Sequence, residues 1–137
     1  MTEASDVIRD ALQEINVQAA EQPLSGDETL TAIRYMNRMV NSWPVDISWT
    51  DITATSDTLA SPSYADRTIV LNLAVEMAPQ FDVPVAPTLR ANASSAYLNM
   101  LTQAQSLATT EYSDNLPKGS GNIYPGYWFS PYYTESD

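Results

Sequence analysis

The chain has 137 residues, which is enough for one domain with a modest core. It carries 6 Lys and Arg residues against 17 Asp and Glu residues, and the net charge of -11 excludes binding driven by phosphate neutralisation, whether to nucleic acid or to an anionic membrane surface. Because there is no Cys and no His, disulfides, thiolate metal sites, Cys nucleophiles and the usual general base at neutral pH are also excluded.

The first predicted helix spans about residues 3–15. Acidic Glu3 and Asp6 lie in its first turn, where the helix dipole favours negative charge. Asn16 is a suitable residue for a left-handed stop. Helical spacing places these apolar side chains on one face: Ile8, Ala11, Leu12 and Ile15.

The second predicted helix follows Ser25-Gly26-Asp27-Glu28, which reads as a capping box with Ser25 as the cap and Glu28 reaching back. Pro44 ends the helix, because proline disfavours helical geometry in the residue before it. The predicted apolar stripe consists of Leu30, Ile33, Met36 or Asn37, Val40 and Trp43.

A short β-ribbon is predicted within about residues 44–60, because residues 45–50 alternate apolar and polar side chains. One or two strands make a ribbon on a helical body rather than a sheet core. We expect the ribbon to protrude, with Trp49 partly exposed or at a contact with another subunit or a tail protein. An ordinary core position for Trp49 is the alternative.

Two more helices complete a predicted four-helix bundle. The third begins with Ser61 as cap and Pro62 as first helical residue, and it ends at Pro79. The fourth begins between Pro84 and Pro87 and continues to about Thr110, with many alanines that allow close approach of a neighbouring helix. The apolar face of the third helix is Ile69, Val70, Leu73 and Met77, and that of the fourth is Leu89, Ala93, Ala96, Tyr97, Met100, Ala104 and Leu107. On the second, third and fourth predicted helices, we predict that these side chains are buried: Ile33, Val40, Leu73, Met77, Leu89 and Met100.

The composition changes after Glu111. Residues 112–137 hold three of the four glycines, three prolines and most of the aromatic residues, and they show neither helical nor strand periodicity. A disordered tail is normally poor in aromatic residues, whereas Tyr and Trp dominate interface energetics. The sequence therefore favours an extended partner-binding arm over residues 112–137, attached to a helical body over residues 1–111. The alternative is an arm that folds back on its own body.

Catalytic chemistry is weakly represented. Two carboxylate pairs, Asp10 with Glu14 and Asp46 with Asp51, lie in polar stretches, whereas a catalytic pair needs one pKa raised by burial. No loop has the ligand pattern of a calcium site, and the Gly119–Gly121 turn lacks the strand and helix that a phosphate loop requires. We therefore predict no catalytic residues, no metal and no cofactor.

Targeting signals are also lacking in the sequence. The acidic first residues do not resemble a signal peptide, and the longest apolar stretch, residues 68–78, is interrupted by Asn72 and Glu76. We expect a soluble protein made in a cytoplasm.

Two segments resemble one known family. The first is Asn72-Leu73-Ala74, followed by Ala78-Pro79 and a long alanine-rich helix; the second is Leu116-Pro117-Lys118-Gly119-Ser120-Gly121-Asn122, followed by an aromatic cluster around Trp128. Both are similar to the adaptor proteins of short-tailed phages, also called tail accessory or head-completion proteins. The layout of the helices fits as well, so the resemblance covers nearly the whole chain, although the arm is shorter and the charge more acidic than in the family.

The resemblance implies a mainly α fold, a small helical bundle with an extended C-terminal arm. It implies a ring of copies of the chain, usually a dodecamer, beneath the portal ring, with the tail nozzle or hub proteins docked on the opposite face. The protein would then be located in the neck or tail of the virion after assembly in the host cytoplasm, with no membrane partner and with DNA only as passing cargo during genome ejection. The portal-binding residues would be Leu116, Pro117, Lys118, Gly119, Ser120, Gly121, Asn122, Tyr124, Tyr127, Trp128, Phe129, Tyr132 and Tyr133.

The acidic balance is compatible with a conduit that does not grip DNA, but it opposes contact between subunits. We therefore predict a free protein that is monomeric or weakly associating and that forms a ring only on its partner. The alternative function is a small virion-associated hydrolase that uses a carboxylate to act on peptidoglycan.

Overall fold

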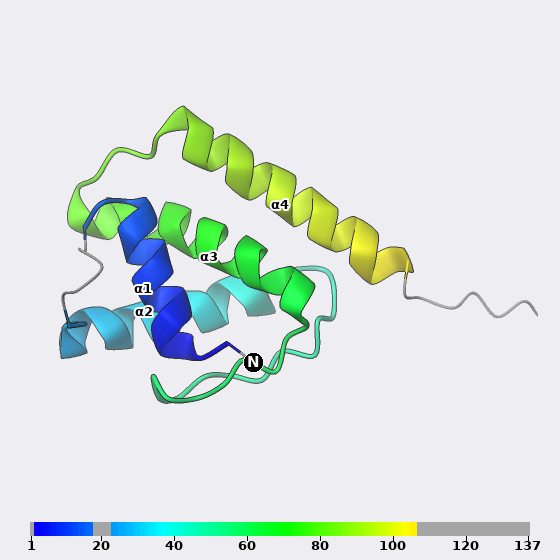
Figure 1. The fold of residues 1–137 in the computed structure, drawn as a ribbon, viewed down its shortest axis with the longest axis horizontal. Helices are drawn as coiled ribbons and strands as arrows, with labels where there is room; N and C mark the ends of the chain where they lie inside the picture. The colour runs from blue at the N-terminus through cyan, green and yellow to red at the C-terminus, as the bar shows by residue number, and fades with distance from the viewer. Residues whose placement is uncertain (1, 18–22, 107–137) are drawn as a thin grey trace, which may run out of the picture.

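The computed structural model describes residues 2–17 and 23–106, and over these ranges the chain is built from helices (Figure 1). In chain order they are α1 (Ala4–Glu14), α2 (Gly26–Asn41), α3 (Ser63–Met77), the short 3₁₀ helix η1 (Ala78–Phe81) and α4 (Pro87–Ser106). The predicted mainly α bundle is therefore confirmed. The last predicted residues of the fourth helix, 107–110, lie outside the described residues.

Helix α3 is the centre of the bundle. It packs against α1, α2 and α4, and α4 runs along its outer side (Figure 1). A helix covered from several directions must be apolar on more than one stripe. Accordingly its buried residues are spread around its circumference: Ala65, Thr68, Ile69, Leu71, Leu73, Ala74 and Met77.

The predicted core is confirmed at each of the six positions selected from the helical stripes. Ile33, Val40, Leu73, Met77, Leu89 and Met100 are all buried. The end of α1 is confirmed too, because Asn16 has a positive φ of 57°, the left-handed geometry that stops a helix.

Residues of the Asn72-Leu73-Ala74 segment join α3 to α4. The Asn72 side-chain amide donates to the carbonyl of Thr68 at 2.9 Å and to that of Ala93, on α4, at 3.3 Å. The Thr68 hydroxyl donates to the carbonyl of Ala96 at 2.9 Å. Backbone carbonyls of α4 are within reach because buried alanines keep the two helices close, as the sequence predicted. Leu73 and Ala74 fill the core beneath this contact.

Three helix ends differ from the prediction. Ser25 is the N-cap of α2, as predicted, but over the described residues the side chains of Ser25 and Glu28 do not form the predicted capping box. Instead the Thr29 hydroxyl donates to the Ser25 carbonyl at 2.6 Å. The N-cap of α3 is Pro62 rather than Ser61. Helix α2 ends at Asn41, before Pro44, and the chain continues in a turn in which the Trp43 N–H donates to the Val40 carbonyl.

The predicted place of Leu30 in the core is wrong. Its side chain is 61% exposed, whereas the neighbouring Thr29 is buried together with Ile33, Met36 and Val40. The buried stripe of α2 therefore passes through position 29 rather than 30. A threonine takes the core position because its hydroxyl bonds to the preceding turn of its own helix, which leaves its methyl group to pack.

The predicted β-ribbon is also wrong. Over residues 44–60 the structure contains no strand; the one β-bridge there joins Thr58 to Glu3. Ser48 has a positive φ of 58°, and its N–H donates to the Asp46 carboxylate at 2.8 Å. The side chains of residues 45–50 still alternate between the core and the surface, but this turn interrupts the extended backbone that a strand requires. The segment does not protrude, because Ile47, Ile52 and Leu59 are buried in the core.

Residues 55–59 form backbone hydrogen bonds with the start of α1. The N–H groups of Ala4 and Ser5 donate to the carbonyls of Asp57 and Thr55, each at 2.9 Å, and the Leu59 N–H donates to the Thr2 carbonyl. These bonds satisfy backbone donors that a helix start otherwise leaves free. The loop therefore caps α1 from a distance in sequence.

Asn37 fastens the same loop to α2. Its side-chain amide donates to the Ile52 carbonyl at 2.8 Å, and its side-chain oxygen accepts from the Ile52 N–H at 2.9 Å. We expect Asn37→Ala to lower the free energy of unfolding by about 1–3 kcal/mol, because it leaves both backbone groups without partners. Urea unfolding measures the loss, with Asn41→Ala as the control, because Asn41 makes one exposed bond to Asp51. Equal effects of the two substitutions would contradict the anchoring role of Asn37.

Asp57 closes the turn at residues 53–57. Its carboxylate accepts from the N–H groups of Ala54 (2.8 Å) and Thr53 (2.9 Å) and from the Thr53 hydroxyl (3.1 Å). These bonds, the one from the Ala54 N–H above all, lower the pKa of Asp57 below its ordinary value.

Because its pKa is lowered, the Asp57 carboxylate stabilises the turn fully when the pH is above the pKa of an unfolded Asp, about 4. This contribution is lost as the pH falls through the lower pKa of Asp57 in the folded protein. We expect the amide signals of Thr53 and Ala54 in NMR spectra to shift with a midpoint below the ordinary pKa of Asp, and Asp57→Asn to abolish that shift. Asp51→Asn, on the same loop, is the control and should leave it unchanged. A midpoint at or above the ordinary Asp value would contradict the assignment.

Candidate functional site

The predicted portal-binding arm lies outside the described residues, which end at position 106. The structure therefore does not place Leu116, Trp128 or any other residue selected in the arm. Of the residues predicted for a partner contact, Trp49 is the one that the structure places.

Trp49 is half-buried and packs against the bundle core. Its indole N–H is buried, and it has no hydrogen-bond acceptor within the part of the chain that the structure describes. A buried donor without an acceptor destabilises the fold. The role of Trp49 in a contact with a subunit or a tail protein stays a prediction.

Fluorescence of Trp49 tests that contact. With Trp43 and Trp128 replaced by Phe, we expect quenching by acrylamide to decrease when the protein is bound to a portal ring, because a subunit contact covers the exposed part of the ring system. The free protein under the same conditions is the reference. Equally strong protection in both states would show that Trp49 is an ordinary core residue.

The carboxylate pairs have no catalytic geometry. Asp10 and Glu14 are both exposed and line a cavity of about 710 Å³ at α1 and α3, together with Asp66 and Arg67. Asp46 and Asp51 are exposed and engaged in separate local bonds, to the Ser48 N–H and to the Asn41 amide. A general acid needs a carboxyl group whose pKa is raised by burial. These pairs therefore give no support to a carboxylate-dependent hydrolase.

Residues 2–17 and 23–106 lack two further features. They contain no group of three or more Asp or Glu side chains placed to hold a metal ion. None of their helices is both long and apolar enough to cross a bilayer.

An apolar groove is the surface feature that sequence reasoning missed. It has a volume of about 560 Å³ and lies at the start of α2, between the first turn of α1 and the turn at residues 53–55. Ile33 belongs to both the groove and the core, and exposed Leu30 forms part of its wall. The signal in the sequence was the helical spacing of α2: the buried positions 29, 32, 33, 36 and 40 form one continuous stripe, and Leu30 lies outside it.

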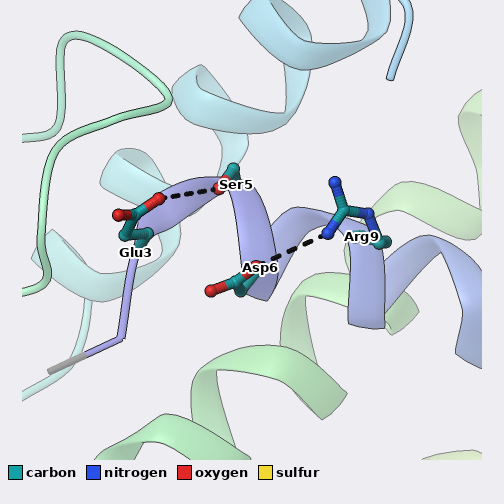
Figure 2. A network of polar contacts seen from close by, with 4 residues as sticks. All are labelled: Glu3, Ser5, Asp6 and Arg9. Carbon is teal, nitrogen blue, oxygen red and sulfur yellow. Dashed lines mark hydrogen bonds and ion pairs between the residues drawn. The ribbon is translucent and has the colours of Figure 1, made fainter. Parts of the chain in front are cut away.

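Figure 2 shows the polar contacts at the start of α1, the part of this helix that meets the groove at Ser5. Ser5, which lines the groove, donates from its hydroxyl to the Glu3 carboxylate at 3.4 Å, and one turn on Arg9 forms an ion pair with Asp6 at 3.5 Å. Both members of the ion pair are substantially exposed, so the pair contributes little to stability. Of these four residues Ser5 alone lines the groove, and its hydrogen-bond partner Glu3 places a carboxylate beside it.

Comparison with known proteins identifies the family. The family model described as P22 tail accessory factor matches residues 48–137, which is more than half of the chain. No curated protein matches the chain. The matched region begins at the loop that carries Trp49, includes α3 and α4, and continues through the aromatic C-terminal segment. The chain is therefore a member of the P22 tail accessory factor family, a family of structural proteins associated with phage tails.

Proposed function

We propose that the protein is the adaptor that forms a ring beneath the portal, joins the capsid to the tail and extends the channel for DNA. The observation that carries this proposal is the family match, because it continues to the last residue and includes the whole aromatic segment. A tail accessory factor works by binding other virion proteins, and an irregular segment rich in Tyr and Trp is suited to such binding.

In this proposal the chain has two parts with different tasks. The helical body, residues 1–111, forms the wall of the ring, and the arm, residues 112–137, binds the portal. The body is suited to a wall because its core is continuous over α1 to α4, so that the side chains of this core are buried without a partner. The tail nozzle or hub proteins would dock on the face opposite the portal.

The charge of the chain supports a conduit. With a net charge of -11, the ring would present an acidic channel, which does not retain passing DNA. The same charge requires that subunits meet mainly through apolar surface. In the described part of the chain two large apolar side chains are strongly exposed, Leu30 on α2 and Leu98 on α4, and they are available for such contacts.

Co-sedimentation with a purified portal ring of the same phage tests the proposal. We expect the full chain to sediment with the portal ring as a closed ring of copies, and to sediment alone as a monomer or a weak associate at the same concentration. The salt concentration should be varied, because repulsion between acidic subunits weakens as salt rises. Stable rings of the isolated protein at low salt, or a lack of binding to the portal ring, would contradict the proposal.

A further inference from the structure

The apolar groove at the start of α2 can accommodate an apolar side chain from outside the described body. Its apolar lining consists of Leu24, Leu30, Ile33 and Ala54, with the methyl-bearing residues Thr29, Thr53 and Thr55. Single exposed apolar residues are common on protein surfaces. Here an exposed leucine instead borders a hollow whose floor, Ile33, reaches into the core, which is the arrangement of an interface pocket.

The groove is acidic at its edge. Asp27 is the one charged residue that lines it, is exposed, and forms no ion pair within the described ranges. Glu3 lies next to Ser5 on the opposite wall (Figure 2). The basic residue Arg34, which follows Ile33 in α2, does not line the groove and therefore does not offset this negative charge there. An occupant with an apolar side chain followed by a positive charge would therefore complement the surface.

We propose that the groove receives Leu116-Pro117-Lys118 from another copy of this chain. Leu116 fills the apolar hollow, and Lys118, the one lysine of the chain, meets Asp27. The proline favours an extended backbone at Leu116, which is the conformation that fits along a groove. The inference rests on the proposed ring and adds the contact that links neighbouring subunits.

The position of the groove favours a neighbouring copy as the source of this segment. Figure 1 shows the end of α4 and the start of α2 at opposite ends of the body. The ten residues 107–116 span at most about 35 Å when extended, and α4 alone, with 20 residues, is about 30 Å long, so the segment would have to be almost fully extended to return to its own groove. A segment that leaves the end of α4 and enters the groove of the next copy makes a head-to-tail contact, and such contacts form a ring when the rotation between copies closes. This assignment takes Leu116, Pro117 and Lys118 out of the predicted portal-binding set and leaves the set from Gly119 to Tyr133 for the portal.

Disulfide trapping tests the contact directly, because the natural chain has no cysteine. The pair Ala54→Cys and Gly119→Cys places one thiol in the groove and one beside Lys118, while Leu30, Asp27, Leu116 and Lys118 stay intact. The control pair is Ala91→Cys and Gly119→Cys, because Ala91 is an exposed alanine on α4 outside the groove and closer in sequence to residue 119. Both full-length proteins are oxidised, free and on a portal ring, and thermal midpoints are recorded to show that they fold.

The expected result is a ladder of cross-linked oligomers whose yield rises with protein concentration and exceeds that of the control pair by about tenfold, which corresponds to a preference of about 1.4 kcal/mol. Yields equal to the control, both free and on the portal ring, would overturn the proposal. A cross-link within one chain that does not depend on concentration would overturn it as well, because it would place the segment in its own groove.

A charge exchange gives a second test in the same cysteine background. We expect Asp27→Lys and Lys118→Asp each to reduce the intermolecular cross-link, and the two together to restore it. A purely structural effect of Asp27 on the first turn of α2 would not be rescued by a change at residue 118. Portal binding of the unmodified chain is measured separately: if it persists while trapping and rescue both fail, the groove assignment alone is wrong, whereas loss of portal binding contradicts the proposed function.

Discussion

Replacing Leu73 by alanine is expected to lower the free energy of unfolding by about 2–5 kcal/mol. Leu73 is fully buried in α3, the helix that packs against the other three, so the cavity left by the substitution lies where α1, α2 and α4 cannot all move inward together. Neighbouring Ala74 is too small to fill the space. Urea unfolding followed by circular dichroism measures the change.

Leu98→Ala is the matched control. It removes the same atoms from a helix, but the side chain is 62% exposed, so the substitution leaves no cavity and should change stability by less than about 0.5 kcal/mol. An unchanged thermal midpoint for Leu73→Ala would contradict the central position of α3 in the bundle.

Replacing Trp128 by alanine is expected to weaken binding to the portal ring by about 2–4 kcal/mol, the effect of losing a central aromatic anchor. Deletion of residues 112–137 should abolish binding and leave the helical body folded, because the core of the described residues is formed by α1 to α4 and the 45–60 loop. Titration of the portal ring measures the affinities, and the thermal midpoint of each variant reports folding.

Trp128→Phe separates the loss of an anchor from a general disturbance of the arm, because it keeps an aromatic ring and should retain a large part of the affinity. If the truncated protein saturates the portal ring with unchanged affinity, residues 112–137 are not the portal-binding element. A truncated protein that no longer folds would instead show that the arm belongs to the body.

The sequence alone determined the helices and most of the core. Helical spacing located Ile33, Val40, Leu73, Met77, Leu89 and Met100 in the interior, and local chemistry located the end of α1 at Asn16. These features depend on residues within one or two turns of each other, so they can be read from a short stretch of sequence. The resemblance on Asn72-Leu73-Ala74 and the C-terminal motif agreed with the family that the comparison identified.

Only the tertiary structure decided the course of residues 45–60 and the surface near α2. Alternating side chains predicted a strand, but a strand needs a partner, and the available hydrogen-bond partners were the Asn37 side chain and the backbone of residues 2–5. The same loop forms one wall of the groove beside Leu30, so neither the groove nor its exposed leucine was visible before the loop was placed. Contacts between residues distant in the chain depend on which elements meet, and one helical stripe does not contain that information.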